Sequence, residues 1–238
     1  MCKFFSFVTE PENNGGKRFY FDWDYRKSNL EKDIADSHSS ICKHFELNED
    51  KCNKYEFDPL TKKFVVDQIN APVDDCIQVE EWVNNLDFKK VVEPLIIKPI
   101  IKPFELKMVK KPTKAQIKLL EEWASVRASV GASVGASVGA SVGASVRASV
   151  GASVGASVGA SVWASVRVSV GDSVGDSIRD SVWDNVWAYT SSFFDIKYEY
   201  DFSSCVKLWE QGLVPSFDGT TWRLHSGKKA EIVYEWKP

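Results

Sequence analysis

The sequence lacks the motifs by which many enzymes are recognised. It contains no glycine-rich phosphate loop, no HExxH zinc helix and no GxSxG nucleophile turn. It also lacks a strong excess of either charge, because 30 basic residues face 33 acidic ones, and this argues against nucleic acid as a partner. We therefore expect no cofactor, and the sequence favours a protein that is not an enzyme.

Cysteine is present without a recognisable pattern. The five cysteines are scattered and include no CxxC pair, and the hydrophobic run at the N-terminus is too short for a secretory signal. An odd, scattered set suits a reducing compartment better than a disulfide framework. We expect a cytoplasmic protein.

Long runs of large apolar residues are absent as well. The longest uncharged stretch, residues 128–146, consists of Ala, Ser, Val and Gly. Its length would allow a membrane span, and glycine at every fourth position forms a GxxxG ladder. Because Leu, Phe and flanking aromatic residues are missing from it, a membrane partner is unfavoured, and a membrane-active protein using this ladder is the last of three functional hypotheses.

What the chain has in abundance is one tetrapeptide. From residue 124 to 187 a unit with the consensus Ala/Asp-Ser-Val-x follows itself sixteen times, with Val168 in one first position and with Gly, Arg or Trp in the fourth position. The second position departs from Ser only at Asn185, and the third departs from Val only at Ile178. Duplication of a twelve-base segment produces such a block, so its length can change without a frameshift. A block this uniform is too monotonous to hold an active site.

The repeat is compatible with a helix or with a β-solenoid. In a strand the first and third positions share the buried face, whereas in a helix each unit advances the same face by only about 40°. Aspartate occupies the first position in the last units, at Asp172, Asp176, Asp180 and Asp184. In a strand these carboxylates would be buried beside valine, and in a helix they lie opposite it. We favour the helix, which needs a packing partner because Gly and Val destabilise an isolated helix.

The flanks have the patterning of small α+β domains, so the predicted fold class is α+β. In the first flank, strands are predicted at 3–8, 18–23, 55–57 and 63–67, and helices at 37–45, 77–86 and 88–97. In the second flank, a strand is predicted at 193–200, a helix at 205–211, and a hairpin from 221–224 and 231–235. The expected organisation is an N-terminal domain (1–97), a Lys/Pro linker (98–112), a helix with the repeat (113–187) and a C-terminal unit (188–238).

Two of these segments carry a more specific signal. Thr113 and Gln116 form a capping-box pattern, which predicts the start of a helix that enters the repeat. The linker holds five lysines against Glu105, which suits either an anionic partner or, more simply, a solvated spacer.

Cys2 is the first candidate for catalysis. Removal of Met1 would expose an N-terminal cysteine whose own α-amine can act as a base. This arrangement resembles the glutamine-amidotransferase class of N-terminal nucleophile hydrolases, although Lys3 and Phe4 replace the Gly-Ile of that class. His38 is a second, weak catalytic candidate, because Asp36 stands two positions before it and offers a carboxylate to the imidazole. A hydrolase using Cys2 is the second functional hypothesis.

A metal site is the other chemical possibility. Four potential zinc ligands fall within fifteen residues, namely His38, Cys42, His44 and Cys52. On a helix His38 and Cys42 would share a face, but His44 would point elsewhere. Exposed histidine and buried cysteine explain the four residues more simply, so they are weak metal candidates.

Short motifs in both flanks are similar to those of one group of sequences. They are Met1-Cys2-Lys3-Phe4, Asp36-Ser37-His38, Asn53-Lys54-Tyr55-Glu56-Phe57, Leu208-Trp209 and residues 212–222. Together they resemble an uncharacterised bacteriophage and prophage family in which some members carry short tandem repeats. The resemblance implies action in the host cytoplasm and no known activity.

The leading functional hypothesis combines these observations. It is a non-enzymatic binding or scaffold protein of phage type, in which a length-variable, self-associating repeat separates two folded ends. The expected partner is a protein or a second copy of the chain.

Overall fold

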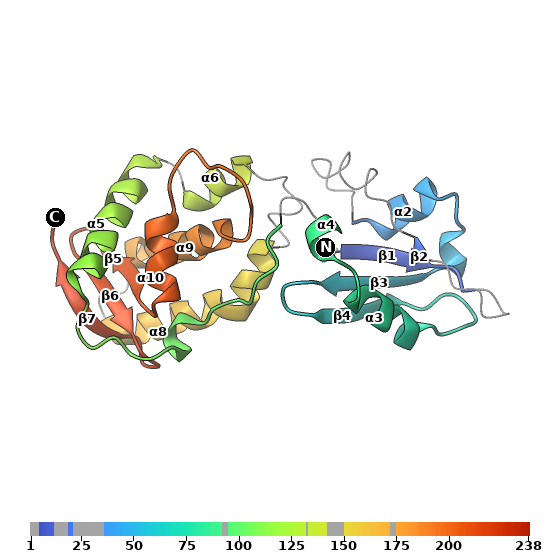
Figure 1. Ribbon diagram of the computed structural model, residues 1–238, viewed down its shortest axis with the longest axis horizontal. Coiled ribbons are helices and arrows are strands. Elements are labelled where there is room, and N and C mark those ends of the chain that lie inside the picture. Colours follow the sequence, from blue (N-terminus) through green and yellow to red (C-terminus); the bar gives the residue numbers. More distant parts are fainter. Residues whose placement is uncertain are drawn as a thin grey trace. The chain divides into compact units, whose positions relative to one another are not determined.

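The computed structural model describes residues 5–11, 19–20, 36–91, 95–131, 133–141, 150–171 and 175–238 (Figure 1). The chain forms two compact units, which are described separately. The first comprises Met1–Lys98 with Val142–Val150, and the second comprises Pro99–Ser141 with Gly151–Pro238. Each unit combines helices with an antiparallel sheet, so the predicted α+β class is confirmed.

The first unit is built on a four-stranded sheet. Its strands are β1 (Phe5–Thr9), β2 (Phe19–Tyr20), β3 (Asn53–Asp58) and β4 (Lys63–Gln68). They pair in the order β2-β1-β3-β4, all antiparallel, and β3 and β4, which contain the strands predicted at 55–57 and 63–67, form a hairpin.

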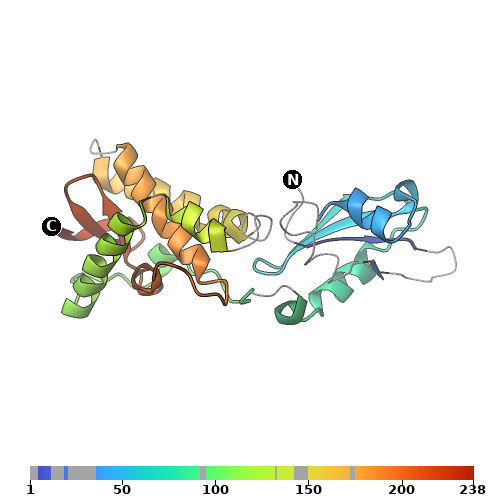
Figure 2. The same cartoon turned by 90° about the horizontal axis from the view of Figure 1, so that it is seen from above.

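Helices cover both faces of this sheet, as Figure 2 shows for α2 (His38–His44) and α3 (Cys76–Asn84). Alternate residues of β1 point to opposite faces. Phe7 therefore packs edge-on against Trp82 of α3, with ring centroids 5.1 Å apart, while Val8 packs against Ile41 of α2. Ser37, at the start of the helix predicted over 37–45, caps α2, since its hydroxyl accepts the Ser40 N–H.

The helix predicted over 88–97 is shorter than expected. Helix α4 covers Phe88–Val91, and residues 96–100 have no regular structure. A proline stands at position 94 and another at 99, and proline both removes a backbone donor and disfavours helix in the residue before it.

In the second unit the repeat is helical rather than a β-solenoid. It supplies the end of α5 (Lys114–Ser129), then α6 (Val134–Ser141), the π-helix η4 (Gly155–Gly159), α8 (Ala160–Val170) and most of α9 (Asp176–Ser191). The capping box predicted at Thr113 and Gln116 is present, with both reciprocal hydrogen bonds.

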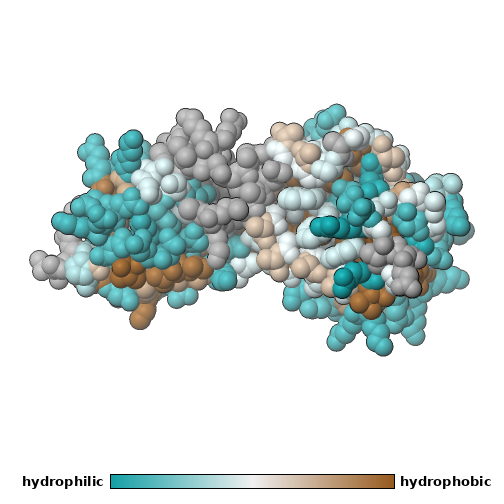
Figure 3. All heavy atoms as spheres, turned by 180° about the vertical axis from the view of Figure 1, so that it is seen from behind, coloured by the Kyte–Doolittle hydropathy of each residue, from teal (hydrophilic) through white to brown (hydrophobic). Residues whose placement is uncertain are grey.

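The third position of the repeat builds the interior. Its side chains are at most 7% exposed at Val130, Val134, Val138, Val150, Val154, Val158, Val162, Val166, Ile178, Val182 and Val186. A period of four nearly matches the helical turn, so valine stays on one face within each short helix. Most outward positions hold Ala and Ser, and the second unit accordingly shows many pale residues in Figure 3.

At the fourth position of the repeat, tryptophan side chains of the last units pack against glycines of earlier units, which have no side chain. The six-membered end of the Trp187 ring lies against Gly151, where an added Cβ would be 2.6 Å from Cζ3. The five-membered end lies against Gly135, where an added Cβ would be 2.9 Å from Cδ1. Trp183 approaches Gly159 in the same way, at 3.1 Å. Glycine, which weakens an isolated helix, here allows α9 to pack closely on the earlier units.

The C-terminal segment shares its core with the repeat instead of forming the separate unit that we expected. Its sheet has the order β5 (Val214–Phe217), β6 (Trp222–Ser226), β7 (Glu231–Trp236), and helix α10 covers Ser203–Glu210. One buried cluster joins α5, α6, α9, α10 and β6 through Leu120, Trp123, Val134, Val138, Ala188, Leu208 and Leu224.

Two expectations about this unit were wrong. Residues 193–200 alternate in polarity like a strand but form a loop before α10. Phe194 makes one isolated bridge, and the segment belongs to neither of the two described sheets. The linker is not a solvated spacer, since Phe104 in the short helix η3 (Pro103–Glu105) is buried. The Ile101 N–H donates to the Tyr189 hydroxyl at 2.8 Å, which fixes the linker to α9.

Candidate functional site

The catalytic residues proposed from the sequence are only partly within the described structure. Cys2 lies outside the described residues. His38 is buried, and its Nε2 lies 3.0 Å from the Tyr55 carbonyl oxygen, which can only accept a hydrogen bond. Its Nδ1 lies 3.4 Å from the Asp67 carboxylate, and Asp36 accepts the Ser6 N–H at 3.0 Å. These contacts hold helix α2 and its N-terminus on the sheet.

The four weak metal candidates do not converge. Cys42 and Cys52 are buried together in the small core beneath α2, whereas His44 is exposed and its ring packs on Phe45. Burial raises the pKa of the Cys52 thiol to about 12, so without a bound metal the thiol is protonated. Within the described residues no group of three or more His, Cys, Asp or Glu side chains could hold a metal ion.

A buried polar network that the sequence patterns did not reveal lies at the end of β3. Asp75 is 1% exposed and accepts hydrogen bonds from the Tyr55 hydroxyl and, at 2.8 Å, from Asn53 Nδ2. The side-chain oxygen of Asn53, Oδ1, in turn accepts the N–H groups of Asn70 and Ala71. Burial and the adjacent carboxylate raise the pKa of Tyr55. The network fixes the loop that leads into α3.

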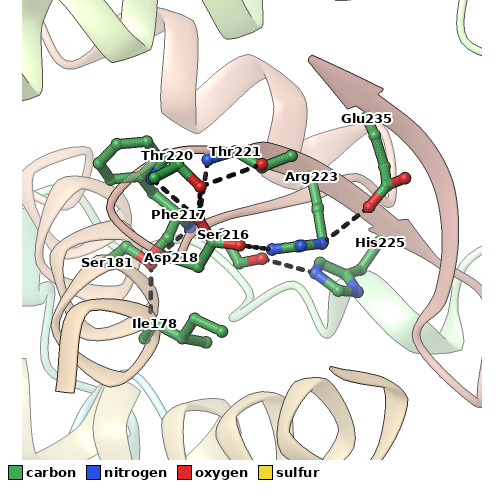
Figure 4. A network of polar contacts seen from close by, with 10 residues as sticks. All are labelled: Ile178, Ser181, Ser216, Phe217, Asp218, Thr220, Thr221, Arg223, His225 and Glu235. Carbon is green, nitrogen blue, oxygen red and sulfur yellow. Dashed lines mark hydrogen bonds and ion pairs between the residues drawn. The ribbon is translucent and has the colours of Figure 1, made fainter. Parts of the chain in front are cut away.

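The pair most like a catalytic dyad lies in the second unit (Figure 4). The Ser216 hydroxyl lies 2.7 Å from His225 Nε2, and His225 Nδ1 lies 3.0 Å from the Ala230 carbonyl oxygen. Because a carbonyl only accepts, Nδ1 carries the proton and Nε2 accepts from Ser216. The Ser169 hydroxyl of the repeat lies 3.1 Å from the same Nδ1.

Burial decides what this dyad can do. Ser216 and His225 are both 0% exposed, so no substrate reaches the hydroxyl. Burial lowers the pKa of His225 to about 4, which keeps the imidazole neutral. The pair therefore ties β5 to β6 and to the turn before β7, and Ser169 adds helix α8 to the same network.

The hairpin of β5 and β6, which contains this pair, is also stabilised by a series of contacts between charged side chains (Figure 4). Asp218 accepts the N–H groups of Thr220 and Thr221, and its second oxygen pairs with Arg223 at 2.6 Å. Burial alone would raise the pKa of Asp218, but these hydrogen bonds outweigh it and hold the pKa well below its usual range. Arg223 also pairs with Glu235 of β7 at 2.9 Å. The motif at 212–222 is thus a stable structural element.

The last two repeat units make specific contacts to this hairpin. The free edge of β5 presents the Phe217 N–H, which donates to Ser181 at 2.9 Å, and the Pro215 carbonyl, which accepts from Asn185 at 2.6 Å. Serine is too short to repeat the second bond, which gives a physical reason for the one Asn at this repeat position. Side chains of α9 thereby satisfy an edge that would otherwise be open to another strand.

The first and last repeat units are joined by an ion pair. Arg127 Nε lies 2.7 Å from Asp184 Oδ2, and both side chains are largely buried. The guanidinium also lies 5.8 Å from the centroid of the Phe217 ring and 5.9 Å from that of Trp222. Asp184, unlike the exposed Asp176 and Asp180, is therefore a structural residue.

The surface of the second unit includes two clefts that could hold part of a partner. One, of about 630 Å³, lies between residues 191–203 and α10. The other, of about 570 Å³, lies between η3 and α8 and is bordered by Lys102, Glu105 and Lys228. Both fall within the range of pockets that hold ligands or partner side chains.

Comparisons with protein-family models, curated proteins and solved structures found no match. Among the described residues, no helix is long and apolar enough to cross a membrane.

Proposed function

We propose that the protein is a non-enzymatic binding protein in which the tetrapeptide repeat serves as the scaffold of the binding surface. The observation that carries the proposal is the difference in burial between the positions of the repeat. The valines of its third position form much of the interior, whereas most of its described alanines and serines are exposed or half-buried, and Ser161 and Ser165 border a surface cleft. The repeat thus contributes shape and packing rather than reactive groups.

The expected partner is another protein. The apolar stripe that would serve self-association is largely covered within the chain, since most of its described valines are at most 7% exposed and Val126 and Val170 are half-buried. Within the described part of the chain, the two clefts of the second unit are unfilled and can receive side chains of a partner. The resemblance to phage sequences adds the host cytoplasm as the proposed compartment.

Cross-linking in cells tests this function against the hydrolase alternative. The full chain carrying an affinity tag is expressed as wild type and as Cys2→Ala, and cross-linked partners are identified by mass spectrometry against a tag-only control. We expect the two forms to yield the same specific partners, because binding requires no nucleophile.

The alternative predicts a different pair of results. Iodoacetamide would label Cys2 much faster than the half-buried Cys76, because a thiolate is the reactive form. Partners would not exceed the control, and Cys2→Ala would abolish the biological effect of the protein. That combination would overturn the binding proposal.

A further inference from the structure

Lysines that are distant in sequence gather on one side of the second unit. The linker packs on the turn between β6 and β7, where the Val109 N–H donates to Ser226 at 3.0 Å and Met108 covers Gly227 (Figure 1). This packing places the linker lysines near the two lysines that follow Gly227 in the turn. The lysines concerned are Lys107, Lys110, Lys111, Lys228 and Lys229, all exposed.

These five lysines, here called the lysine cluster, are not neutralised within the described part of the chain. None forms a salt bridge there, whereas Lys102 pairs with Glu105 at 3.2 Å and Lys118 with Glu122 at 3.7 Å. The chain as a whole carries a net charge of −3, so this positive charge is local and not a property of the composition. Uncompensated charge on one face favours association with an anion.

The cleft between η3 and α8 lies next to the cluster, and Lys228 belongs to both. Its floor contains the buried side chains of Phe104, Val158 and Val162. Its rim includes Ser165, whose hydroxyl forms no hydrogen bond with other described residues. A cavity of about 570 Å³ accommodates one or two side chains of a partner.

We propose that this cleft and the lysine cluster bind an acidic segment of a partner protein, an inference that rests on the proposed binding function. Glutamate or aspartate would pair with the lysines, and a neighbouring side chain would enter the cleft. Nucleic acid fits less well. Phe104 is only 7% exposed and offers no ring for stacking, and the cluster contains no arginine for bidentate phosphate contacts.

Fluorescence anisotropy with defined probes tests the inference on the full chain. The first probe is a labelled peptide in which Glu alternates with Leu, and the second is the same peptide with Gln in place of Glu. Single-stranded oligothymidine and phosphatidylserine vesicles serve as competitors. The variants are Lys228→Glu, in the cleft, and Lys43→Glu, an exposed position on α2 with the same change of charge.

The expected result is binding of the Glu peptide that weakens with added salt, little binding of the Gln peptide, and a loss of roughly fivefold or more in Lys228→Glu. Lys43→Glu should bind like the wild type. Equal affinities of the two variants, or competition by oligothymidine or vesicles at lower concentration than by unlabelled peptide, would overturn the inference. So would a sedimentation coefficient that rises with protein concentration in the wild type but not in Lys228→Glu, because the cleft would then hold a second copy.

Failure here is distinguishable from failure of the proposed function. If specific cross-linked partners persist in Lys228→Glu at wild-type levels, the binding function stands and the assignment of this cleft is wrong. If no specific partner is found with any form, the binding function itself is wrong.

Discussion

Replacing Gly155 by alanine should stabilise the protein, whereas replacing Gly151 should leave its stability unchanged or lower it, although both glycines occupy the fourth repeat position in one continuous helical segment. At Gly151 an added Cβ would lie 2.6 and 2.8 Å from two carbons of Trp187. At Gly155 the nearest atom, on Trp183, is 4.0 Å away, an ordinary contact. The comparison therefore isolates the fit between glycine and tryptophan from the general preference of helices for alanine.

The magnitudes follow from two opposing effects. Alanine stabilises a helix by about 1 kcal/mol relative to glycine, and this gain applies at both positions. Overpacking of a filled core costs about 1–3 kcal/mol, and it applies only at Gly151. The Trp187 ring cannot retreat, because its other end meets Gly135. We expect the free energy of unfolding of Gly155→Ala to be about 1 kcal/mol higher than that of the wild type. It should also be about 1–3 kcal/mol higher than that of Gly151→Ala.

Thermal unfolding followed by far-ultraviolet circular dichroism measures this difference. The decisive control repeats both substitutions in a Trp187→Leu background, where the steric conflict is removed and Gly151→Ala should become as favourable as Gly155→Ala. If Gly151→Ala stabilises the wild-type protein as much as Gly155→Ala does, the close packing of Trp187 on the repeat is refuted.

Three further predictions concern the junction of repeat and hairpin. Asn185→Ala should cost about 1–3 kcal/mol in denaturant unfolding, because it leaves a buried β5 carbonyl without its donor, while Ser177→Ala on the exposed side should change stability by less than about 0.5 kcal/mol. Arg127→Ala should destabilise by roughly 2 kcal/mol, and Arg167→Ala, at an exposed fourth position, should not; equal effects would contradict the ion pair. Unfolded His225 gains a proton below its ordinary pKa of 6.5, whereas the folded form stays neutral to about pH 4. Stability should therefore fall by about 3 kcal/mol as pH drops across this interval, and a His225→Gln variant with the same pH dependence would rule out this source.

Local patterns predicted most elements, because their causes are local. The capping box at Thr113, the cap at Ser37 and the hairpin of β3 and β4 depend on neighbouring residues, and each was placed within a few positions. The helical repeat also followed from a local argument, namely the position of aspartate opposite valine. The loop at 193–200 was misassigned because its alternation reflects burial against α10 and not the pairing of a strand.

The candidate site depends on contacts that the sequence does not contain. The lysines of the linker are visible as a charged run, but their proximity to Lys228 arises from the bond between Val109 and Ser226, across more than a hundred residues. The burial of Ser216 and His225 likewise depends on packing by α8 and α9. Residue types alone indicate which chemistry is possible. Only the fold shows that the Ser216–His225 pair is buried, whereas the cleft beside Lys228 is open.

The ion pair between the first and last repeat units has a consequence for how the chain finds its native arrangement. Sliding one helix by a single tetrapeptide places Val on Val and Gly on Gly again, so neighbouring registers of the interior units are nearly degenerate. The residues that distinguish the native register are few: Arg127, Asp184, Asn185 and the two tryptophans of α9. The energy gap that makes folding unique therefore rests on the ends of the repeat. Neutralising those ends should leave a helical, compact protein that samples several registers.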